Sequence, residues 1–385
     1  MKKDAIVVGC GLSGAVVARE LANNGFKVLI VDRRGHIGGN MYDFYDEHGI
    51  LVHKYGPHTF HTVKKELFEY MNRYAEWDEY HLTCGAEIMG KCTPTPFNFQ
   101  TIDDYYDKDE AEKIKKHIKE VFGDRSTATV LEVLSCDDEV VRGYGDFLFE
   151  HDYSLYSAKQ WGVSPNEIDP SILKRVPLRF NYEEGYFDDE YQYMPHTTYT
   201  EFFNNLLRHE NIEVRLKTDA LEHLHIKNNI IKWDEQESVC PLIFTGAVDE
   251  LFDHRLGSLP YRSLRFEWRF EENVDSKQDM PVVAYPEADG FTRIVEFKKL
   301  PMQNVKGTSY EIEYPLQYDE NADQEPYYPL LTEKSQKDYK GYKKLAAGIE
   351  NLYCCGRLAD FKYYNMDQAL EKALEVSKEV LDALK

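Results

Sequence analysis

Three glycines and one carboxylate near the N-terminus have the residue types and spacing of a phosphate-binding turn. Gly9, Gly11 and Gly14 form a G-x-G-x-x-G pattern. In such a turn the first glycine permits the tight bend, the second admits a pyrophosphate to the backbone, and the third lets a helix pack against a strand. Asp32 follows roughly 20 residues after the turn, where a carboxylate usually holds a ribose hydroxyl. These residues predict a site for an adenine dinucleotide.

The segments around this turn have the pattern of two strands and a helix. The apolar runs 5–8 and 28–31 are typical of buried strands in a parallel sheet, and a helix-like run lies between them. Leu12 and Ser13 begin that run, so their N–H groups would face the phosphates. A lone glycine pattern is a weak indication, but two apolar strands and the following acid strongly favour a dinucleotide site over a chance turn.

A second pair of glycines lies just beyond the second strand. Gly38 and Gly39 stand in the segment from Arg33 to Asn40, and a plain NAD domain does not need them. A backbone that passes close to a longer cofactor does need them, so the segment favours FAD, with its pyrophosphate and ribityl chain alongside. A simple loop is the alternative interpretation.

Histidines and clustered aromatic residues follow. His58 and His61 flank a Gly-Pro turn, which is consistent either with a flavin contact or with hydrogen-bonded structural histidines. The segments 156–162 and 173–187 combine Trp and Tyr with Lys and Arg. Such a combination can stack a base and bind a diphosphate, although core packing explains it equally well when each segment is taken alone.

Length and composition limit the kind of protein. A chain of 385 residues suits two or three domains. The formal net charge of −22 argues against a nucleic-acid partner, and an anionic ligand would need a local cluster of arginines. No apolar run approaches the ~20 residues of a membrane span, the N-terminal run is too short for a signal peptide, and the cysteines lack zinc-site spacing. We therefore expect no membrane span, no bound metal and reduced cysteines in the cytoplasm.

Helical and extended patterns alternate along the rest of the chain. The sequence predicts helices over residues 64–74, 109–122, 140–156, 199–209 and 365–385. The predicted inner face of the second helix consists of Ala111, Ile114, Ile118, Val121 and Phe122. Strands are predicted over residues 212–216, 230–233, 242–245, 261–270, 282–285, 292–297, 309–314 and 352–357, the last as a buried strand. Alternation between 261 and 314 predicts an antiparallel sheet that carries Arg262 and Arg293.

Taken together, these segments resemble bacterial UDP-galactopyranose mutases over essentially the whole chain. The glycine pattern is common to many flavoproteins, whereas the Gly-Pro-His, Lys-Gln-Trp-Gly and Leu-Lys-Arg-Val-Pro segments together are specific to this family. The resemblance rests on residues 9–14, 36–40, 55–62, 159–162, 173–177, 179–182, 326–329 and 356–367.

The resemblance implies an α/β fold, of the α+β multidomain kind. It has a Rossmann-like FAD-binding domain, an inserted helical domain and a twisted antiparallel β-sheet domain. The FAD-binding domain would comprise residues 1–79, 197–248 and 330–385, the helical insertion residues 102–172, and the sheet or substrate domain residues 80–101, 173–196 and 249–329.

The resemblance also implies a reaction without net oxidation or reduction. In this family, N5 of reduced FAD attacks the anomeric carbon of UDP-galactopyranose or UDP-galactofuranose and expels UDP, and the sugar ring then recloses on another hydroxyl. The resemblance therefore implies an isomerase that supplies galactofuranose donors for polysaccharide biosynthesis in the cytoplasm.

The family's functional residues have counterparts here. Arg175 and Arg293 match the two diphosphate arginines and, with His61 beside the flavin, are the predicted catalytic residues. The predicted cofactor-binding residues are Gly9, Gly11, Leu12, Ser13, Gly14, Asp32, Arg33, Gly38, Gly39, Asn40, His58, Arg357, Met366 and Asp367. The predicted substrate-binding residues are Tyr153, Tyr156, Trp161, Arg175, Tyr186, Arg262, Arg293, Tyr328, Tyr363 and Asn365. Glu313 matches a further cleft residue.

Several positions depart from the family pattern. Leu82 and Ala284 stand where typical members carry asparagine, Asn365 stands in place of an aspartate, and Tyr153 replaces a phenylalanine near the uracil. An apolar residue where a hydroxyl partner is expected suits a less hydroxylated sugar. The same chemistry on another sugar nucleotide, such as dTDP-fucopyranose and dTDP-fucofuranose, is therefore an alternative function.

Two other classes share the N-terminal pattern. One is a flavin oxidoreductase of the amine-oxidase type, which would consume reductant, and the other is a binding protein of the prenylated-GTPase escort type, which would be colourless. The family resemblance favours the mutase. It implies a nucleotide-sugar substrate, a cellular reductant (NAD(P)H, reduced flavin or flavodoxin) and a homodimer.

Overall fold

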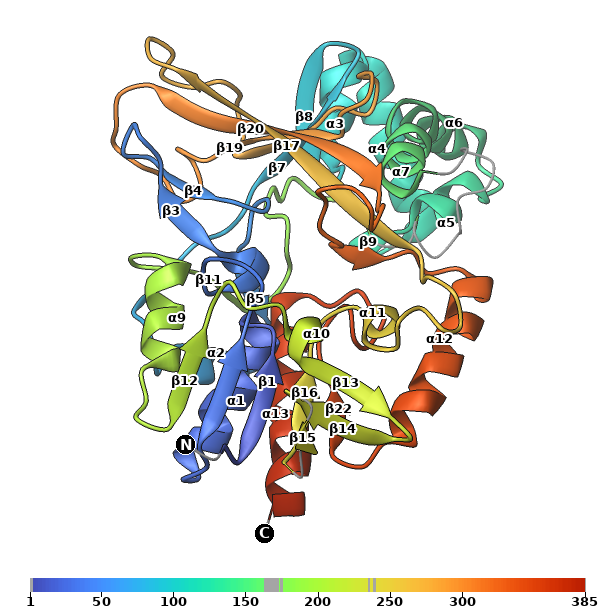
Figure 1. Ribbon diagram of the computed structural model, residues 1–385. Helices are drawn as coiled ribbons and strands as arrows, with labels where there is room; N and C mark the ends of the chain where they lie inside the picture. Colours follow the sequence, from blue (N-terminus) through green and yellow to red (C-terminus); the bar gives the residue numbers. More distant parts are fainter. Residues whose placement is uncertain (1–2, 163–172, 174–175, 235, 238–239, 385) are drawn as a thin grey trace.

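The computed structural model describes residues 3–162, 173, 176–234, 236–237 and 240–384. Figure 1 shows two parts: a lower part around a parallel sheet, where both termini lie, and an upper part in which a long twisted sheet stands beside a group of helices. No helix of the described residues is long and apolar enough to cross a membrane. None of the seven cysteines in the described chain forms a disulfide.

A five-stranded parallel sheet organises the lower part. Its strand order is β12-β2-β1-β16-β22, with β1 at Ala5–Val8, β2 at Val28–Val31, β12 at Ile212–Arg215, β16 at Leu242–Phe244 and β22 at Leu352–Cys354. The order reverses direction at β1, which is where a ligand is expected in an open parallel sheet. All five strands were predicted. The prediction that the last one is buried was wrong, because β22 is an edge strand and its residues are only half-buried.

Helices and small sheets surround this parallel sheet. The helices are α1 (Leu12–Asn23), α2 (Lys65–Met71), α9 (Tyr199–Leu207), α10 (Ala220–His223), α11 (Val248–Leu251), α12 (Glu333–Ala347) and α13 (Met366–Leu384), with a 3₁₀ turn η1 at Gly39–Met41. The strands are β3 (Asp43–Tyr45) with β4 (Leu51–His53), β5 (Phe60–Thr62), β11 (Tyr191–Pro195) and β6 (Trp77–Glu79), and the sheet β13 (Leu224–Lys227), β14 (Ile230–Trp233) and β15 (Gln236–Glu237). The predicted helices 64–74, 199–209 and 365–385 correspond to α2, α9 and α13.

A seven-stranded sheet forms the core of the upper part. Its order is β21-β17-β20-β19-β18-β7-β8, with β21 at Tyr328–Pro329, β17 at Tyr261–Glu271, β20 at Thr308–Gln317, β19 at Arg293–Glu296, β18 at Val282–Ala284, β7 at Cys84–Ile88 and β8 at Lys91–Thr95. The expected sheet is therefore present, but it is not wholly antiparallel. β18 pairs with β7 in parallel, because the chain reaches these two strands from distant segments.

Helices on one side of this sheet form a separate hydrophobic cluster. They are α3 (Phe99–Tyr105), α4 (Lys108–Phe122), α5 (Val130–Leu134), α6 (Glu139–Leu148) and α7 (Ser154–Trp161), with a π-helical turn η2 (Phe149–Tyr153) between the last two and a short pair of strands, β9 (Thr127–Ala128) and β10 (Leu178–Arg179). The predicted inner face of α4 was wrong at one position. Val121 is exposed, whereas Lys115 is buried because its ammonium group pairs with Asp103.

The division into three domains remains a proposal. The separate core clusters of the parallel sheet and of the helical group support it. One boundary needs revision, because β11 pairs with β5 and β6 of the expected FAD-binding domain and not with the large sheet.

Candidate functional site

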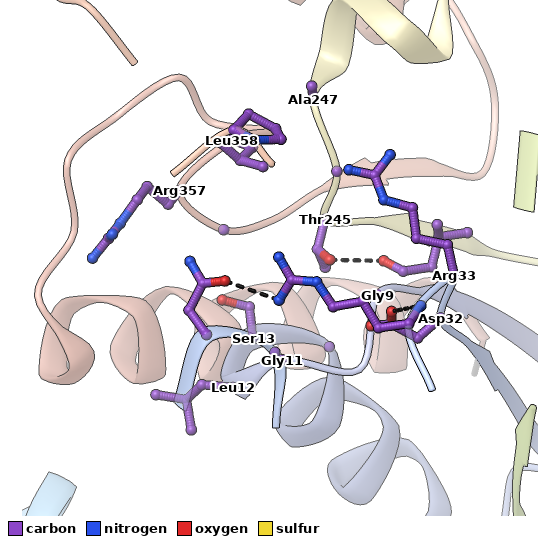
Figure 2. Close-up of a pocket in the computed structure, with 18 of the residues that line it drawn as sticks. Gly9, Gly11, Leu12, Ser13, Asp32, Arg33, Thr245, Ala247, Arg357 and Leu358 are labelled. Atoms are coloured by element: carbon purple, nitrogen blue, oxygen red, sulfur yellow. Dashed lines mark hydrogen bonds between the residues drawn. The ribbon is translucent and has the colours of Figure 1, made fainter. Parts of the chain in front are cut away.

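A cavity of about 250 Å³ opens at the carboxyl ends of the parallel strands. Gly9, Asp32 and Gly246, which follow β1, β2 and β16, line it together with Gly356, which follows β22. Figure 2 shows Arg33 and Arg357 at opposite ends of the cavity, with Gly9, Gly11 and Ser13 between them. The elongated arrangement suits a ligand that extends from one arginine to the other.

The glycine turn has a conformation that other residues cannot adopt. Gly9 has φ +98°, and a Cβ on it would lie 2.0 Å from the hydroxyl oxygen of Thr245. A Cβ on Gly14 would lie 2.0 Å from the carbonyl oxygen of Gly9. Gly11 is the N-cap of α1 and forms no side-chain capping bond, so the first N–H groups of the helix remain available. A Cβ on Gly39 would lie 2.8 Å from Cα of Gly11, so both glycine segments form one cradle for a phosphate.

Charged residues at one end of the cavity are already paired. The carboxylate of Asp32 accepts hydrogen bonds from the backbone N–H groups of Cys10 and Arg34, at 2.7 and 2.8 Å. Arg33 and Arg34 both pair with Glu325, at 2.9 and 3.2 Å. The side chain of Asp32 therefore stabilises the glycine turn. The ion pairs of Glu325 attach the loop before β21 to this end of the cavity.

His58 lines the same cavity in a defined tautomer. Its Nδ1 lies 2.8 Å from the carbonyl oxygen of Gly56, so Nδ1 carries the proton and Nε2 has a free lone pair. Burial lowers the pKa of His58 to about 4, which keeps the ring neutral. The buried His53 accepts a hydrogen bond from the backbone N–H of His58 at 3.0 Å and positions this turn.

All but one of the predicted cofactor-binding residues line this cavity. Residues of this set that line the cavity are Gly9, Gly11, Leu12, Ser13, Gly14, Asp32, Arg33, Gly38, Gly39, Asn40, His58, Arg357 and Met366. Asp367 lies outside the lining, because its carboxylate accepts a hydrogen bond from the Thr62 hydroxyl at 3.2 Å. Asn365, which was predicted to bind substrate, lines this cavity instead.

A second group of polar residues lies on the large sheet and is centred on Arg293. Nε of Arg293 donates a hydrogen bond of 2.7 Å to Glu313, which is 2 % exposed. Burial opposes the positive charge, but the Glu313 carboxylate outweighs it and raises the pKa of Arg293 well above its usual value. Arg293 is thus a permanent cation, with its Nε side held by the sheet.

Aromatic residues surround this cation. Tyr156 and Tyr363 lie near enough to influence the charge of Arg293, and burial raises the pKa of Tyr156 to about 12. The ring of Tyr328 is edge-on both to Trp161 and to Tyr363, with centroids 5.7 and 5.8 Å apart. Burial raises the pKa of Tyr186, and Tyr156 and Arg293 lie near enough to influence it as well. The structure therefore brings these predicted substrate residues together.

Arg262 has a different position from the one expected of a ligand-binding residue. It is buried, and its guanidinium donates to the backbone carbonyls of Gln160 and Lys159, at 3.1 and 3.2 Å. Gly162 ends α7 with φ +67°, and a Cβ there would lie 2.5 Å from Nη1 of Arg262. Arg262 thus caps the carboxyl end of α7 and holds the helix that carries Tyr156 and Trp161.

Two other predicted residues, Tyr153 and His61, do not join the group around Arg293. Tyr153 is buried among the helices and donates its hydroxyl hydrogen to the carbonyl of Val176 at 2.8 Å. His61 lies outside the cavity lining, stacks on Phe187 with ring centroids 3.6 Å apart and pairs with Asp189. Arg175 lies outside the described residues.

The sequence did not predict several of the residues that line the cavity. Thr218 and Ala220 follow β12, and Thr245 follows β16, so the general rule that ligands lie at the carboxyl ends of parallel strands pointed to them. Glu250 and Glu325 had no signal in the sequence, because their roles depend on contacts with the distant Arg33. Among the described residues, no group of three or more His, Cys, Asp or Glu could hold a metal ion.

Comparison with known sequences gives two family matches. Residues 152–363 match the family described as UDP-galactopyranose mutase, and residues 7–74 match the NAD(P)-binding Rossmann-like domain. The chain is 34% identical to "Probable UDP-galactopyranose mutase" of Klebsiella pneumoniae, over 99% of this chain and 96% of the relative. It is 33% identical to the dTDP-fucopyranose mutase of Escherichia coli, over 97% of both chains. It is also 32% identical to the UDP-galactopyranose mutase of Mycoplasma pneumoniae, over 99% of this chain and 96% of the relative.

Solved structures share the fold. A reduced UDP-galactopyranose mutase superposes with a TM-score of 0.67 at 14% identity and covers 99% of this chain and 96% of that one. A putative protoporphyrinogen oxidase from Exiguobacterium superposes with a TM-score of 0.65 at 13% identity, over 99% of both chains. The same architecture therefore occurs in proteins with different described activities, and the side chains around Arg293 have to distinguish between them.

Proposed function

Because this chain belongs to the UDP-galactopyranose mutase family, we propose that it is an isomerase that interconverts UDP-galactopyranose and UDP-galactofuranose on reduced FAD, without net oxidation or reduction. One observation carries the proposal. Arg357 lines the dinucleotide cavity, and its guanidinium lies 4.9 Å from the ring centroid of Tyr363, which belongs to the group around Arg293. A cofactor in the cavity and a ligand beside Arg293 would therefore meet at Arg357 and Tyr363.

The residues of the cavity fit FAD. The cradle of Gly11 and Gly39 leaves room for a pyrophosphate, and the uncapped start of α1 offers N–H groups to it. Asp32 would accept from the ribose at one end, and Arg357 would pair with a phosphate. Bound and reduced, the flavin would supply the nucleophile for the anomeric carbon.

The residues around Arg293 fit the nucleotide part of the substrate. The terminal guanidinium nitrogens of Arg293 would bind the diphosphate, and each charge-assisted hydrogen bond is typically worth ~1.5–3 kcal/mol. Burial raises the pKa values of Tyr156, Tyr186 and Tyr328, so their hydroxyl groups remain protonated at neutral pH and would donate to phosphate oxygens. The hydroxyl group of Tyr363 would be a further contact. Trp161 would contact the base. We propose Arg175 as the second diphosphate arginine.

A second candidate substrate is a dTDP-linked 6-deoxyhexose. The Escherichia coli relative is a dTDP-fucopyranose mutase. Ala284 pairs directly with Arg293 across two strands, and Ala86 stands next in the same row of the sheet. Ala284 is thus an apolar neighbour of the cation, so a methyl group beside it would leave no polar partner without a hydrogen bond.

The experiment that tests both candidates is product analysis. The protein, reduced with dithionite, is incubated separately with UDP-galactofuranose and with dTDP-fucofuranose, and nucleotide sugars are separated by chromatography. Conversion of the galactose compound at the higher kcat/KM supports the main proposal. A higher kcat/KM for the fucose compound replaces it with the second candidate, and conversion of neither compound refutes both.

We further propose that a cellular reductant (NAD(P)H, reduced flavin or flavodoxin) supplies the electrons, that the chain forms a homodimer and that it acts in the cytoplasm. Gel filtration with light scattering tests the dimer. Anaerobic flavin bleaching with each reductant identifies the electron donor.

A further inference from the structure

Two buried glutamates lie side by side behind Arg293. Glu311 and Glu313 are two residues apart on β20, so their side chains project from the same face of the sheet. Glu313 stands opposite Arg293 on β19, whereas Glu311 stands opposite Val295. Glu311 is 0 % exposed. Of two neighbouring carboxyl groups, only one therefore faces a cation.

Counting hydrogen-bond donors shows that the two carboxyl groups cannot both be ionised. Oε2 of Glu313 accepts from Arg293, but Oε1 of Glu313 and both oxygens of Glu311 are buried and receive no hydrogen bond from any described residue. An ionised carboxylate in that environment carries a large desolvation penalty. Burial and the negative charge of Glu313 both raise the pKa of Glu311 well above its usual value.

Glu296 shows how this sheet provides hydrogen-bond partners for a buried glutamate. It is also 0 % exposed, but its carboxylate accepts from the Thr308 hydroxyl at 2.7 Å and from the backbone N–H groups of Lys277 and Gln278, at 2.8 and 3.1 Å. Lys299 supplies a cation at 3.6 Å. Glu311 has none of these partners among the described residues, so its carboxyl group must act as a donor and not as an acceptor.

We propose that Glu311 is a positioning residue, whose protonated carboxyl group donates a hydrogen bond to Oε1 of Glu313 and thereby holds Glu313 against Nε of Arg293. The pair of glutamates then carries one proton and one negative charge, which Arg293 balances. With Nε engaged by Glu313, the terminal nitrogens of Arg293 are the ones that would bind a ligand. Gly56 allows this packing, since a Cβ there would lie 3.2 Å from Oε1 of Glu313. The consequence for substrate binding rests on the proposed function, but the protonation state does not.

Infrared difference spectroscopy tests the protonation state without reference to activity. The spectrum of the parent protein minus that of Glu311→Gln is expected to contain the C=O stretch of a protonated carboxyl group, with a downshift in D₂O. The matched control is Glu267→Gln on the neighbouring strand, where Arg269 pairs with an ionised carboxylate at 2.5 Å and no such band is expected. Absence of the band in the Glu311→Gln difference overturns the proposal, even if the protein proves to be an active mutase.

Steady-state kinetics test the positioning role. The amide of Glu311→Gln can still donate to Glu313, so its KM for UDP-galactofuranose should stay within about two-fold of the parent value. Glu311→Leu removes the donor and should raise KM roughly ten-fold, with a smaller change in kcat. Equal KM values for the two variants overturn the positioning role. If Glu311→Leu does not fold, the infrared result alone decides.

Discussion

The dinucleotide cavity and the group around Arg293 are built in opposite ways. The cavity uses backbone: glycines that leave room, a helix start without a capping side chain, and strand ends that converge. The group around Arg293 uses side chains, which an ion pair to the buried Glu313, a helix cap and edge-on aromatic rings hold in place. Substitutions that add a Cβ should therefore damage the first region, and substitutions that remove a donor should damage the second.

The same difference distinguishes cofactor binding, which many proteins of this fold share, from the choice of substrate. The cavity offers the backbone features that the proposed FAD would need, and the same architecture recurs in a putative protoporphyrinogen oxidase. The side chains around Arg293 would select the ligand that meets the cofactor. Variants that affect one region and spare the other test whether the two are independent.

The largest effect is expected from Gly14→Val. A Cβ at this position would lie 2.0 Å from the Gly9 carbonyl oxygen, so the helix start must move away from the turn. We expect the flavin content of the purified protein to fall roughly ten-fold or more. Flavin absorbance per mole of protein measures this. The control is Gly143→Ala in α6, where a Cβ meets nothing within 4 Å and flavin content should not change.

Arg293→Lys should damage only the second region. Lysine retains the charge but loses the planar set of donors, so kcat/KM for the nucleotide sugar should fall roughly 10²-fold while the flavin content stays constant. Arg265→Lys on β17 is the control, because Arg265 lies over the exposed side of Tyr314 and outside the cleft. Loss of flavin in Arg293→Lys would show that the regions are not independent.

Arg262→Lys tests the helix cap. A lysine cannot donate to the carbonyls of both Lys159 and Gln160 in the same geometry, so α7 should shift with Tyr156 and Trp161. The expected result is a roughly ten-fold higher KM with an unchanged flavin content. Arg269→Lys is the matched control on the exposed side of β17. A rise in KM of the same size in the control would contradict the proposal that Arg262 positions α7.

His53→Gln tests the histidine turn that lies between the two regions, through the pH dependence of stability. Burial lowers the pKa of His53 from 6.5 to about 3. The unfolded chain therefore binds this proton first, and the stabilisation is complete above pH 6.5 and is lost as the pH falls. Between pH 6.5 and 5.5 the parent should lose about 1 kcal/mol more stability than His53→Gln, because the amide accepts from His58 but does not titrate.

Urea denaturation at the two pH values measures this difference. His196→Gln is the control, because His196 is exposed and its hydrogen bond to Asp78 raises its pKa. An acid-induced loss in His53→Gln as large as in the parent would contradict the assignment.

The local patterns of the chain predicted most of the lower part of the fold. The strands β1, β2 and β16 are short apolar runs next to turn residues, and β12 alternates apolar and charged residues, so the identity of all four depends on neighbours in sequence. The helix α12 was missed for the converse reason. Only Ser335 and Tyr342 are buried on it, so its sequence lacks an apolar stripe. The half-buried state of β22 depends on its place at the sheet edge, which the sequence does not contain.

In the candidate site, too, the parts that depend on one local segment were predictable and the parts that depend on distant contacts were not. The glycine turn is one continuous segment, and its spacing alone predicted a dinucleotide cavity. The group around Arg293 combines α7 with strands of the large sheet, whose register decides that Glu313 faces Arg293 and that Arg262 reaches α7. Family resemblance supplied Arg293 and the tyrosines, but it did not predict the helix-capping role of Arg262 or the burial of Glu311 beside Glu313.

The central claim is that reduced flavin serves an isomerisation and is not consumed. The most direct measurement is the number of molecules of UDP-galactopyranose formed from UDP-galactofuranose per electron pair supplied, in anaerobic solution with the flavin spectrum followed at the same time. We expect many product molecules per electron pair, a flavin that stays reduced, and no product from the oxidised protein. Product in proportion to reductant consumed, or equal activity of the oxidised protein, would contradict it.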